Sequence, residues 1–381
     1  MKHVNIPASL LVLVVLGMTG CNSGSTKETD QQTASATTLP EDSASDPGGA
    51  NALKPKGAKP AWGPSITPQM QVVIEQLASY GAKPIPQLPA KEARLNPSPT
   101  TAVMDVMKQY NIPMPAPKSD TTGRAIPVAG GTIHARIYTP KEGAGPFPLI
   151  VYYHGGGWVI ADLDTYNASA QGLCEQVGAV VVSVAYRQAP EHKFPVQHQD
   201  SFAAYQWVLA NAASLKGDAR RVAVVGESAG GNLAANVSIM ARDRKIAMPL
   251  HQVLVYPVAN NDVNSASYLK YASAKPLDKP MMEWFIAKTV ASPSQSADPR
   301  ISLVRANLKG LPATTLIGAE IDPLQTEGKL LADKLEAAGV KVNYKLYDGV
   351  THEFFGMATV VPEAKQAQAY ASDALKQSFQ K

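Results

Sequence analysis

Hydrophobic and polar residues follow three successive patterns along this chain of 381 residues. Residues 22–60 contain almost no large apolar side chains, whereas two segments between residues 66 and 110 carry apolar residues at helical spacing. From residue 148 onwards, short runs rich in Val and Ile alternate with amphipathic stretches. The patterns predict an unstructured segment, then a small helical region, then a domain of alternating strands and helices.

The helical region is expected to form a cap over about residues 66–125. Its two helices are predicted at Ile66–Gly81 and Thr100–Tyr110, and the proline-rich segment Lys83–Pro99 separates them. Apolar and polar residues then alternate along Thr132–Pro140, which predicts a half-buried strand.

The alternating region predicts a mostly parallel sheet with helices on both faces. Strands are expected at residues 148–153, 179–185, 221–226, 251–256, 313–318 and 342–347, and helices at 165–177, 196–212, 229–241 and 324–339. In such sheets the chemistry takes place at the carboxyl ends of the strands. The globular domain is therefore predicted over residues 66–381.

The first 21 residues are interpreted as a signal peptide. Lys2 precedes the apolar stretch Ala8–Met18, which is too short to span a bilayer, and MTGC then ends at Cys21. This ending resembles the bacterial lipobox, although Met18 stands where Leu is usual; ordinary secretory cleavage and a chance cysteine are the alternatives. A lipid on Cys21 and a disordered tether over residues 22–65 predict a protein of the bacterial cell envelope, anchored to a membrane on its periplasmic or outer side.

Composition excludes two classes of protein. Apolar residues make up 45% of the chain and charged residues 17%, so disorder throughout is excluded. The net charge is only +4, and Lys and Arg are scattered, so no nucleic-acid partner is expected. Cys174 is the one cysteine of the body, so no intrachain disulfide is expected there; its helical setting favours a buried structural thiol over a reactive one.

The stretch Gly226–Gly230, GESAG, fits the G-x-S-x-G pattern of a nucleophile elbow, in which a sharp strand-to-helix turn exposes a serine hydroxyl. The alternative is a glycine-rich turn without a catalytic serine, which can have the same sequence. The position between an apolar run and a helix-like segment favours the elbow, with Ser228 as the nucleophile.

A serine nucleophile needs oxyanion donors, and Gly155, Gly156 and Gly157 follow a predicted strand in the sequence HGGGW. The alternatives are a tight glycine turn or a phosphate-binding loop. No Gly-Lys-Ser or Gly-Lys-Thr follows, so a phosphate-binding loop is disfavoured.

The serine also needs a base and an acid, which follow it along the chain in this type of fold. His251 opens a strand, whereas His352 follows the last predicted strand and fits the base. Asp322 follows the neighbouring strand and is favoured as the acid over Asp348, which lies close enough to His352 for a turn role. Asp262 and Asp298 fit poorly.

Together, HGGGW, YRQAPEHKFP, GESAGGN, AEIDPLQTEG and THEFF resemble the hormone-sensitive lipase family, the bacterial family IV esterases. The resemblance runs from about Thr67 to the end and implies an α/β-hydrolase fold with an N-terminal helical cap. It also implies Ser228 as nucleophile, His352 as general base and acid, and Asp322 as its orienting partner. Implied oxyanion donors are Gly155, Gly156 and Ala229, with Gly157 as an alternative and His154 as a brace for the loop.

The chain departs from the family at two positions. Glu227 stands in the elbow where Asp is usual, and Glu353 follows the histidine where Gly is more usual, which leaves the triad intact and can alter access to it. Cap residues expected to cover the site, or simply to pack in the core, are Met70, Val73, Leu77, Met104 and Met107, together with a helix near residues 281–290.

The resemblance implies a serine carboxylesterase that cleaves short- to medium-chain acyl esters through an acyl-enzyme. Amide or formamide hydrolysis, acyl transfer and a non-catalytic binding role on the same scaffold are the alternatives. The implied mechanism needs no metal and no organic cofactor, and THEFFG lacks the second histidine of a zinc-binding H-E-x-x-H motif. The expected partner is a small ester; the oligomeric state is left open.

Overall fold

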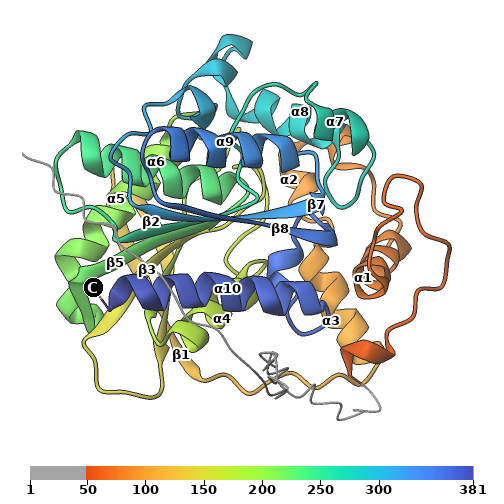
Figure 1. Ribbon diagram of the computed structural model, residues 1–381, viewed down its shortest axis with the longest axis horizontal. Coiled ribbons are helices and arrows are strands. Elements are labelled where there is room, and N and C mark those ends of the chain that lie inside the picture. The colour runs from red at the N-terminus through yellow and green to blue at the C-terminus, as the bar shows by residue number, and fades with distance from the viewer. Residues whose placement is uncertain (1–48, 381) are drawn as a thin grey trace, which may run out of the picture. The chain divides into compact units, whose positions relative to one another are not determined.

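The structure is a computed structural model that describes residues 49–380. Eight strands of this part of the chain form one sheet in the order β1-β2-β4-β3-β5-β6-β7-β8 (Figure 1). The strands are β1 Ser119–Val128, β2 Gly131–Pro140, β3 Phe147–Tyr153, β4 Val180–Ala185, β5 Gly217–Glu227, β6 His251–Val255, β7 Ala313–Ile321 and β8 Val342–Thr351. Strand β2 is antiparallel to both neighbours, and every pair from β4 to β8 is parallel.

Helices cover both faces of the sheet, as predicted. Those on one face are α5 Val196–Asn211, α6 Ala229–Asp243 and α9 Gln325–Ala337, and those on the other are α4 Asn167–Val177 and α10 Pro362–Phe379 (Figure 1). Neighbouring residues of β3 pack on opposite faces of the sheet: Ile150 is buried in one core cluster and Val151 in the other. Because both faces are buried, most residues of the central strands are apolar. Within residues 49–380, no helix has the length and apolar character needed to cross a bilayer.

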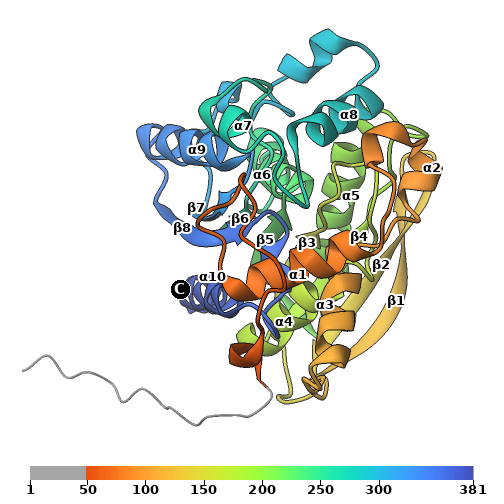
Figure 2. The same cartoon turned by 90° about the vertical axis from the view of Figure 1, so that its right-hand side faces the viewer.

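The N-terminal cap contains α1 Pro68–Ser79, the short α2 Ala90–Ala93 and α3 Pro99–Gln109. Helix α3 begins where Ser98 and Thr101 form a reciprocal capping box, with Pro99 in the first helical position. Helices α1 and α3 pack together, and α1 reaches the end of β8, where Thr351 contacts Met70 (Figure 2). Two further helices, α7 Ala266–Lys270 and α8 Lys279–Thr289, lie between β6 and β7 in the sequence.

The cap ends earlier than residue 125, because Ser119 already begins strand β1. This strand lies at the edge of the sheet and pairs only with β2. Only Ser119 and Ile126 are buried along its length. The strand therefore lacks the alternation of buried and exposed residues from which a half-buried strand is predicted.

Residues 49–65 belong to the folded domain, so the boundary predicted at residue 65 is too late. Leu53 is only 2% exposed and joins the core cluster on the α1 side of the sheet. The carboxylate of Glu75 on α1 accepts hydrogen bonds from the backbone N–H groups of Lys56 at 2.8 Å and Gly57 at 3.0 Å. Such hydrogen bonds can order a polar segment even though its apolar residues follow no regular spacing. The predicted signal peptide, Cys21 and most of the predicted tether lie outside the described residues.

Replacing Leu53 by Ala tests whether this segment is part of the domain. Deleting a buried leucine side chain leaves a cavity, so we expect the free energy of unfolding to fall by about 2–4 kcal/mol. Urea denaturation measures this change. Leu95→Ala is the matched control because Leu95 is 82% exposed, and it should shift stability by less than about 0.5 kcal/mol. Equal, small effects of the two substitutions would show that Leu53 is not packed.

Candidate active site

The turn between β5 and α6 has the geometry of a strained elbow. Ser228 adopts φ 56° and ψ −118°, which side chains other than glycine rarely accept. A Cβ on Gly226 would lie 2.0 Å from the carbonyl oxygen of Gly230, and a Cβ on Gly230 would lie 2.0 Å from that of Tyr153. Only glycine permits this approach of the backbone, so the strained turn predicted from GESAG is confirmed.

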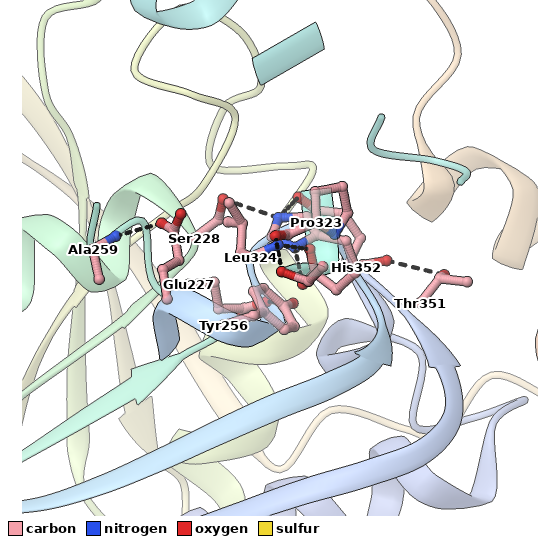
Figure 3. A network of polar contacts seen from close by, with 12 residues as sticks. Glu227, Ser228, Tyr256, Ala259, Pro323, Leu324, Thr351 and His352 are labelled. Atoms are coloured by element: carbon pink, nitrogen blue, oxygen red, sulfur yellow. Dashed lines mark hydrogen bonds and ion pairs between the residues drawn. The ribbon is translucent and has the colours of Figure 1, made fainter. Parts of the chain in front are cut away.

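The structure brings Ser228, His352 and Asp322 together, and Figure 3 labels Ser228 and His352 within this network. His352 Nε2 lies 2.9 Å from Ser228 Oγ, and His352 Nδ1 lies 2.7 Å from Asp322 Oδ2. The second oxygen of Asp322 accepts the backbone N–H of Leu324 at 2.9 Å, which fixes the carboxylate. All three side chains are buried, at 3% exposure or less. They form a continuous hydrogen-bonded chain from carboxylate to hydroxyl.

The rival candidates lie elsewhere. Asp348 is exposed on β8, and Asp298 pairs with the neighbouring Arg300 at 2.8 Å. His251 opens β6 at the opposite end of the strand from the elbow, where its Nε2 lies 2.9 Å from Thr315 Oγ1. Asp262 lies in the loop before α7 and accepts the backbone N–H of Asn264. The structure brings none of the four into the hydrogen-bonded chain.

The charges around His352 favour its protonated form. Burial of the ring lowers its pKa, but the carboxylates of Asp322, Glu353 and Glu227 outweigh burial and raise the pKa above its ordinary value of 6.5. The ring also packs on Tyr256, with ring centroids 4.4 Å apart. The histidine is therefore held firmly and prepared to carry a proton.

Glu227, the residue before the serine, is buried beneath the site. The hydroxyl of Tyr152 donates to its Oε1, and the hydroxyl of Tyr256 donates to its Oε2 at 2.5 Å. Burial, and next the charge of Glu353, raise the pKa of Glu227 to about 7. Sequence reasoning noticed Glu227 but missed both tyrosines, because an aromatic residue within or directly after a buried strand looks like ordinary core.

The glycine loop predicted to hold the oxyanion follows β3 and lies against the elbow. A Cβ on Gly155 would lie 3.2 Å from the carbonyl oxygen of Glu227, and Gly157 packs against Phe285 of α8. Gly156 lies between them with φ +91°, a backbone conformation that favours glycine. Ala229 is the first residue of α6, so its N–H has no intrahelical acceptor.

His154 braces this loop, as the resemblance implied. Its Nδ1 lies 2.9 Å from the carbonyl oxygen of Gly155, and its ring stacks on Tyr186 with centroids 4.4 Å apart. Burial lowers the pKa of His154 to about 4, so the ring is neutral at physiological pH. A neutral, stacked ring serves as a rigid support.

The cap residues expected near the site differ in how deeply they are buried. Met70, Val73 and Met107 are buried in the cluster that also contains Tyr166 and Tyr256, and Leu77 packs partly against it. Met104 of α3 is 48% exposed, so it does not pack in the core, and its expected position over the site stays a prediction. Cys174 is fully buried, and burial raises its pKa to about 12, so the prediction of a structural thiol is confirmed.

A hollow of about 360 Å³ lies between α8 and the loop after β6. Its apolar wall includes Met282, Ile286 and Val290, and its polar rim includes Asn260. The same loop reaches the elbow, because the N–H of Val258 donates to the carbonyl oxygen of Ser228 at 3.1 Å. Among residues 49–380, no three or more His, Cys, Asp and Glu side chains gather as metal ligands would.

Comparisons with known proteins identify the family and the relatives of this chain. The profile of a family described as alpha/beta hydrolase fold matches residues 150–356. Carboxylesterase NlhH of Mycobacterium tuberculosis is 38% identical over 251 residues, which cover 65% of this chain and 79% of that protein. Ethyl acetate hydrolase of Pseudomonas putida is 36% identical over 253 residues, with the same coverage of 65% and 79%.

Solved structures give the same result. The esterase of Pyrobaculum calidifontis superposes with a TM-score of 0.73 at 35% identity, covering 82% of this chain and 98% of that one. A thermostable esterase from Pseudomonas putida ECU1011 reaches a TM-score of 0.76 at 31% identity, covering 83% and 98%. The chain therefore belongs to the α/β-hydrolase fold family, in agreement with the resemblance to hormone-sensitive lipases that its motifs carry.

Proposed function

We propose that this chain is a serine carboxylesterase that hydrolyses short- to medium-chain acyl esters through an acyl-enzyme intermediate. It is a carboxylic ester hydrolase, as are the relatives that match it over about two thirds of its length. The observation that carries the mechanism is the continuous hydrogen-bonded chain from Asp322 through His352 to Ser228. This is the arrangement that activates a serine hydroxyl in unrelated hydrolases.

The acylation step follows from the positions of the three side chains. His352 Nε2 takes the proton of Ser228 Oγ while that oxygen attacks the ester carbonyl carbon. Asp322 accepts a hydrogen bond from the Nδ1–H group, which keeps the free lone pair of Nε2 directed at the serine. The same carboxylate stabilises the imidazolium that forms.

Backbone N–H groups would stabilise the tetrahedral intermediate. We assign this role to Gly155, Gly156 and Ala229, with Gly157 as the alternative donor in the loop. Losing one such donor costs on the order of a hundredfold in turnover. His352 then protonates the departing alcohol, and a water molecule repeats the cycle on the acyl-enzyme to release the acid.

The hollow beside α8 suits the acyl chain. Its volume of about 360 Å³ and its apolar wall fit a short or medium chain. A second hollow, of about 420 Å³, is lined by charged residues such as Arg94 and Glu191, so it suits an apolar acyl chain poorly.

The alternatives share the scaffold. A non-catalytic binding protein would be expected to have lost part of the triad, which is complete here. Amide or formamide cleavage and acyl transfer use the same three residues, and the names of the relatives favour ester hydrolysis over both.

Replacing Ser228 by Ala tests the nucleophile. The variant removes one hydroxyl from a buried position, so we expect a folded protein whose kcat on 4-nitrophenyl butyrate is at least about 10³-fold lower. Rapid mixing should also show a product burst in the natural protein and none in the variant. Unchanged melting temperature serves as the control for folding. Turnover within tenfold of the natural protein would refute the assignment of Ser228.

The pH dependence of kcat/KM tests the base. His352 acts as a base only when neutral, so activity is lost as pH falls through its pKa. Because neighbouring carboxylates raise that pKa above 6.5, the acid limb of the profile should have its midpoint above pH 6.5. A midpoint at or below 6.5 would contradict the electrostatic account of the site.

We also propose that Cys21 carries a lipid that anchors the enzyme to a membrane of the cell envelope. Cys21 lies outside the described residues, and the support is the motif MTGC after an apolar stretch. Expressed in a bacterium fed labelled palmitate, the natural protein should take up label and Cys21→Ser should not. Cys174→Ser is the matched control and should keep the label. Equal labelling of the two variants, or a mature form that starts at another residue, would contradict lipidation of Cys21.

A further inference from the structure

Glu353 lies beside the reacting nitrogen of the candidate base. Its Oε1 is 3.9 Å from His352 Nε2, and its side chain keeps 19% of its surface exposed. The residue adopts φ +69°, a conformation that suits the glycine more usual at this position. Glu353 therefore has a backbone conformation that is unfavourable for a residue with a side chain.

Its surroundings hold the carboxylate toward the space that a substrate would occupy. The hydroxyl of Tyr166 donates to Glu353 Oε1 at 2.5 Å. That hydroxyl also lies against the oxyanion loop, since a Cβ on Gly155 would fall 2.2 Å from it. Glu353 is therefore close to the base and is joined through Tyr166 to the predicted oxyanion loop, the two groups that an ester must contact.

The alcohol part of the ester must come close to this carboxylate. During acyl transfer the leaving oxygen receives its proton from His352 Nε2, so it must lie within hydrogen-bond distance of that nitrogen. The first few atoms beyond that oxygen then lie within reach of Glu353, which is itself 3.9 Å from the same nitrogen.

The carboxylate has no cationic side chain to balance it. Within residues 49–380, its one ion pair is with the imidazole of His352, and no Lys or Arg pairs with it. Burial and the charge of Asp322 raise the pKa of Glu353, while His352 and Tyr166 oppose the rise. When ionised, the group is an anion in a site from which water is partly excluded, where it attracts a nearby cation strongly.

We propose that Glu353 is a specificity-determining residue that selects esters whose alcohol part carries an ammonium group near the ester oxygen. This proposal rests on the proposed esterase function and names a substrate class for it. An ammonium group two or three bonds from the ester oxygen gains Coulomb attraction from Glu353, whereas a neutral group of the same shape gains none.

Two butyrate esters of equal shape test this preference at pH 8. One has a 2-(trimethylammonio)ethyl alcohol part, and the other has the neutral 3,3-dimethylbutyl group. The natural protein should show a kcat/KM for the cationic ester about tenfold above that for the neutral one. In Glu353→Gln, which keeps an oxygen for the Tyr166 hydroxyl, the ratio should fall to about one. Any effect of Glu353 on His352 acts on both esters and cancels in the ratio.

Two further variants make the test specific. Asp348→Asn removes an exposed carboxylate on β8, four residues before His352, so both the rates and the ratio should match the natural protein. Glu353→Gly suits the local backbone and should lose the preference as Glu353→Gln does, which guards against a folding defect in either variant.

A ratio near one in the natural protein, or the same high ratio in Glu353→Gln, would overturn the proposal. Hydrolysis of 4-nitrophenyl butyrate without hydrolysis of either test ester would overturn it too, while the esterase function stands. No hydrolysis of any ester by the folded natural protein would overturn the esterase function, and the selection by Glu353 with it.

Discussion

The site depends on how closely the backbone approaches itself at the elbow. Gly226 packs on the carbonyl of Gly230, and Gly230 packs on the carbonyl of Tyr153, with no room for a Cβ at either glycine. The turn is tied to the next strand as well, because Ser228 N donates to Val255 at 2.8 Å. Strands β3, β5 and β6 thus meet at one strained residue. Its hydroxyl is held in place before any substrate arrives, so little ordering remains to be done during the reaction.

Strand register brings the other two residues to that hydroxyl. Ile321 and Thr351 are paired across β7 and β8, so the next residues, Asp322 and His352, leave the sheet side by side. The register of β7 and β8 shifts between Ala319 and Ile321, so this irregularity decides which residues leave the sheet together. Around this pair the chain places two further carboxylates, and the pKa of one of them, Glu227, is raised to about 7. The chain thus places three carboxylates, those of Asp322, Glu227 and Glu353, around His352.

Sequence reasoning predicted the parallel strands, the covering helices and the three residues of the hydrogen-bonded chain, because buried strands and elbow glycines leave local signals. It missed β1, whose exposed side chains carry no period, and the ordering of residues 49–65, which depends on backbone bonds to Glu75. It also missed Tyr152, Tyr166 and Tyr256. Their roles arise from contacts between residues far apart along the chain, which no local pattern encodes.

The measurement that tests the central claim most directly is mass spectrometry of the protein, quenched in acid within milliseconds of mixing with 4-nitrophenyl butyrate. We expect one butyryl group per chain, located by proteolysis on the peptide that contains Ser228. Rapid hydrolysis without any covalent adduct, or an adduct on another residue, would contradict the serine mechanism.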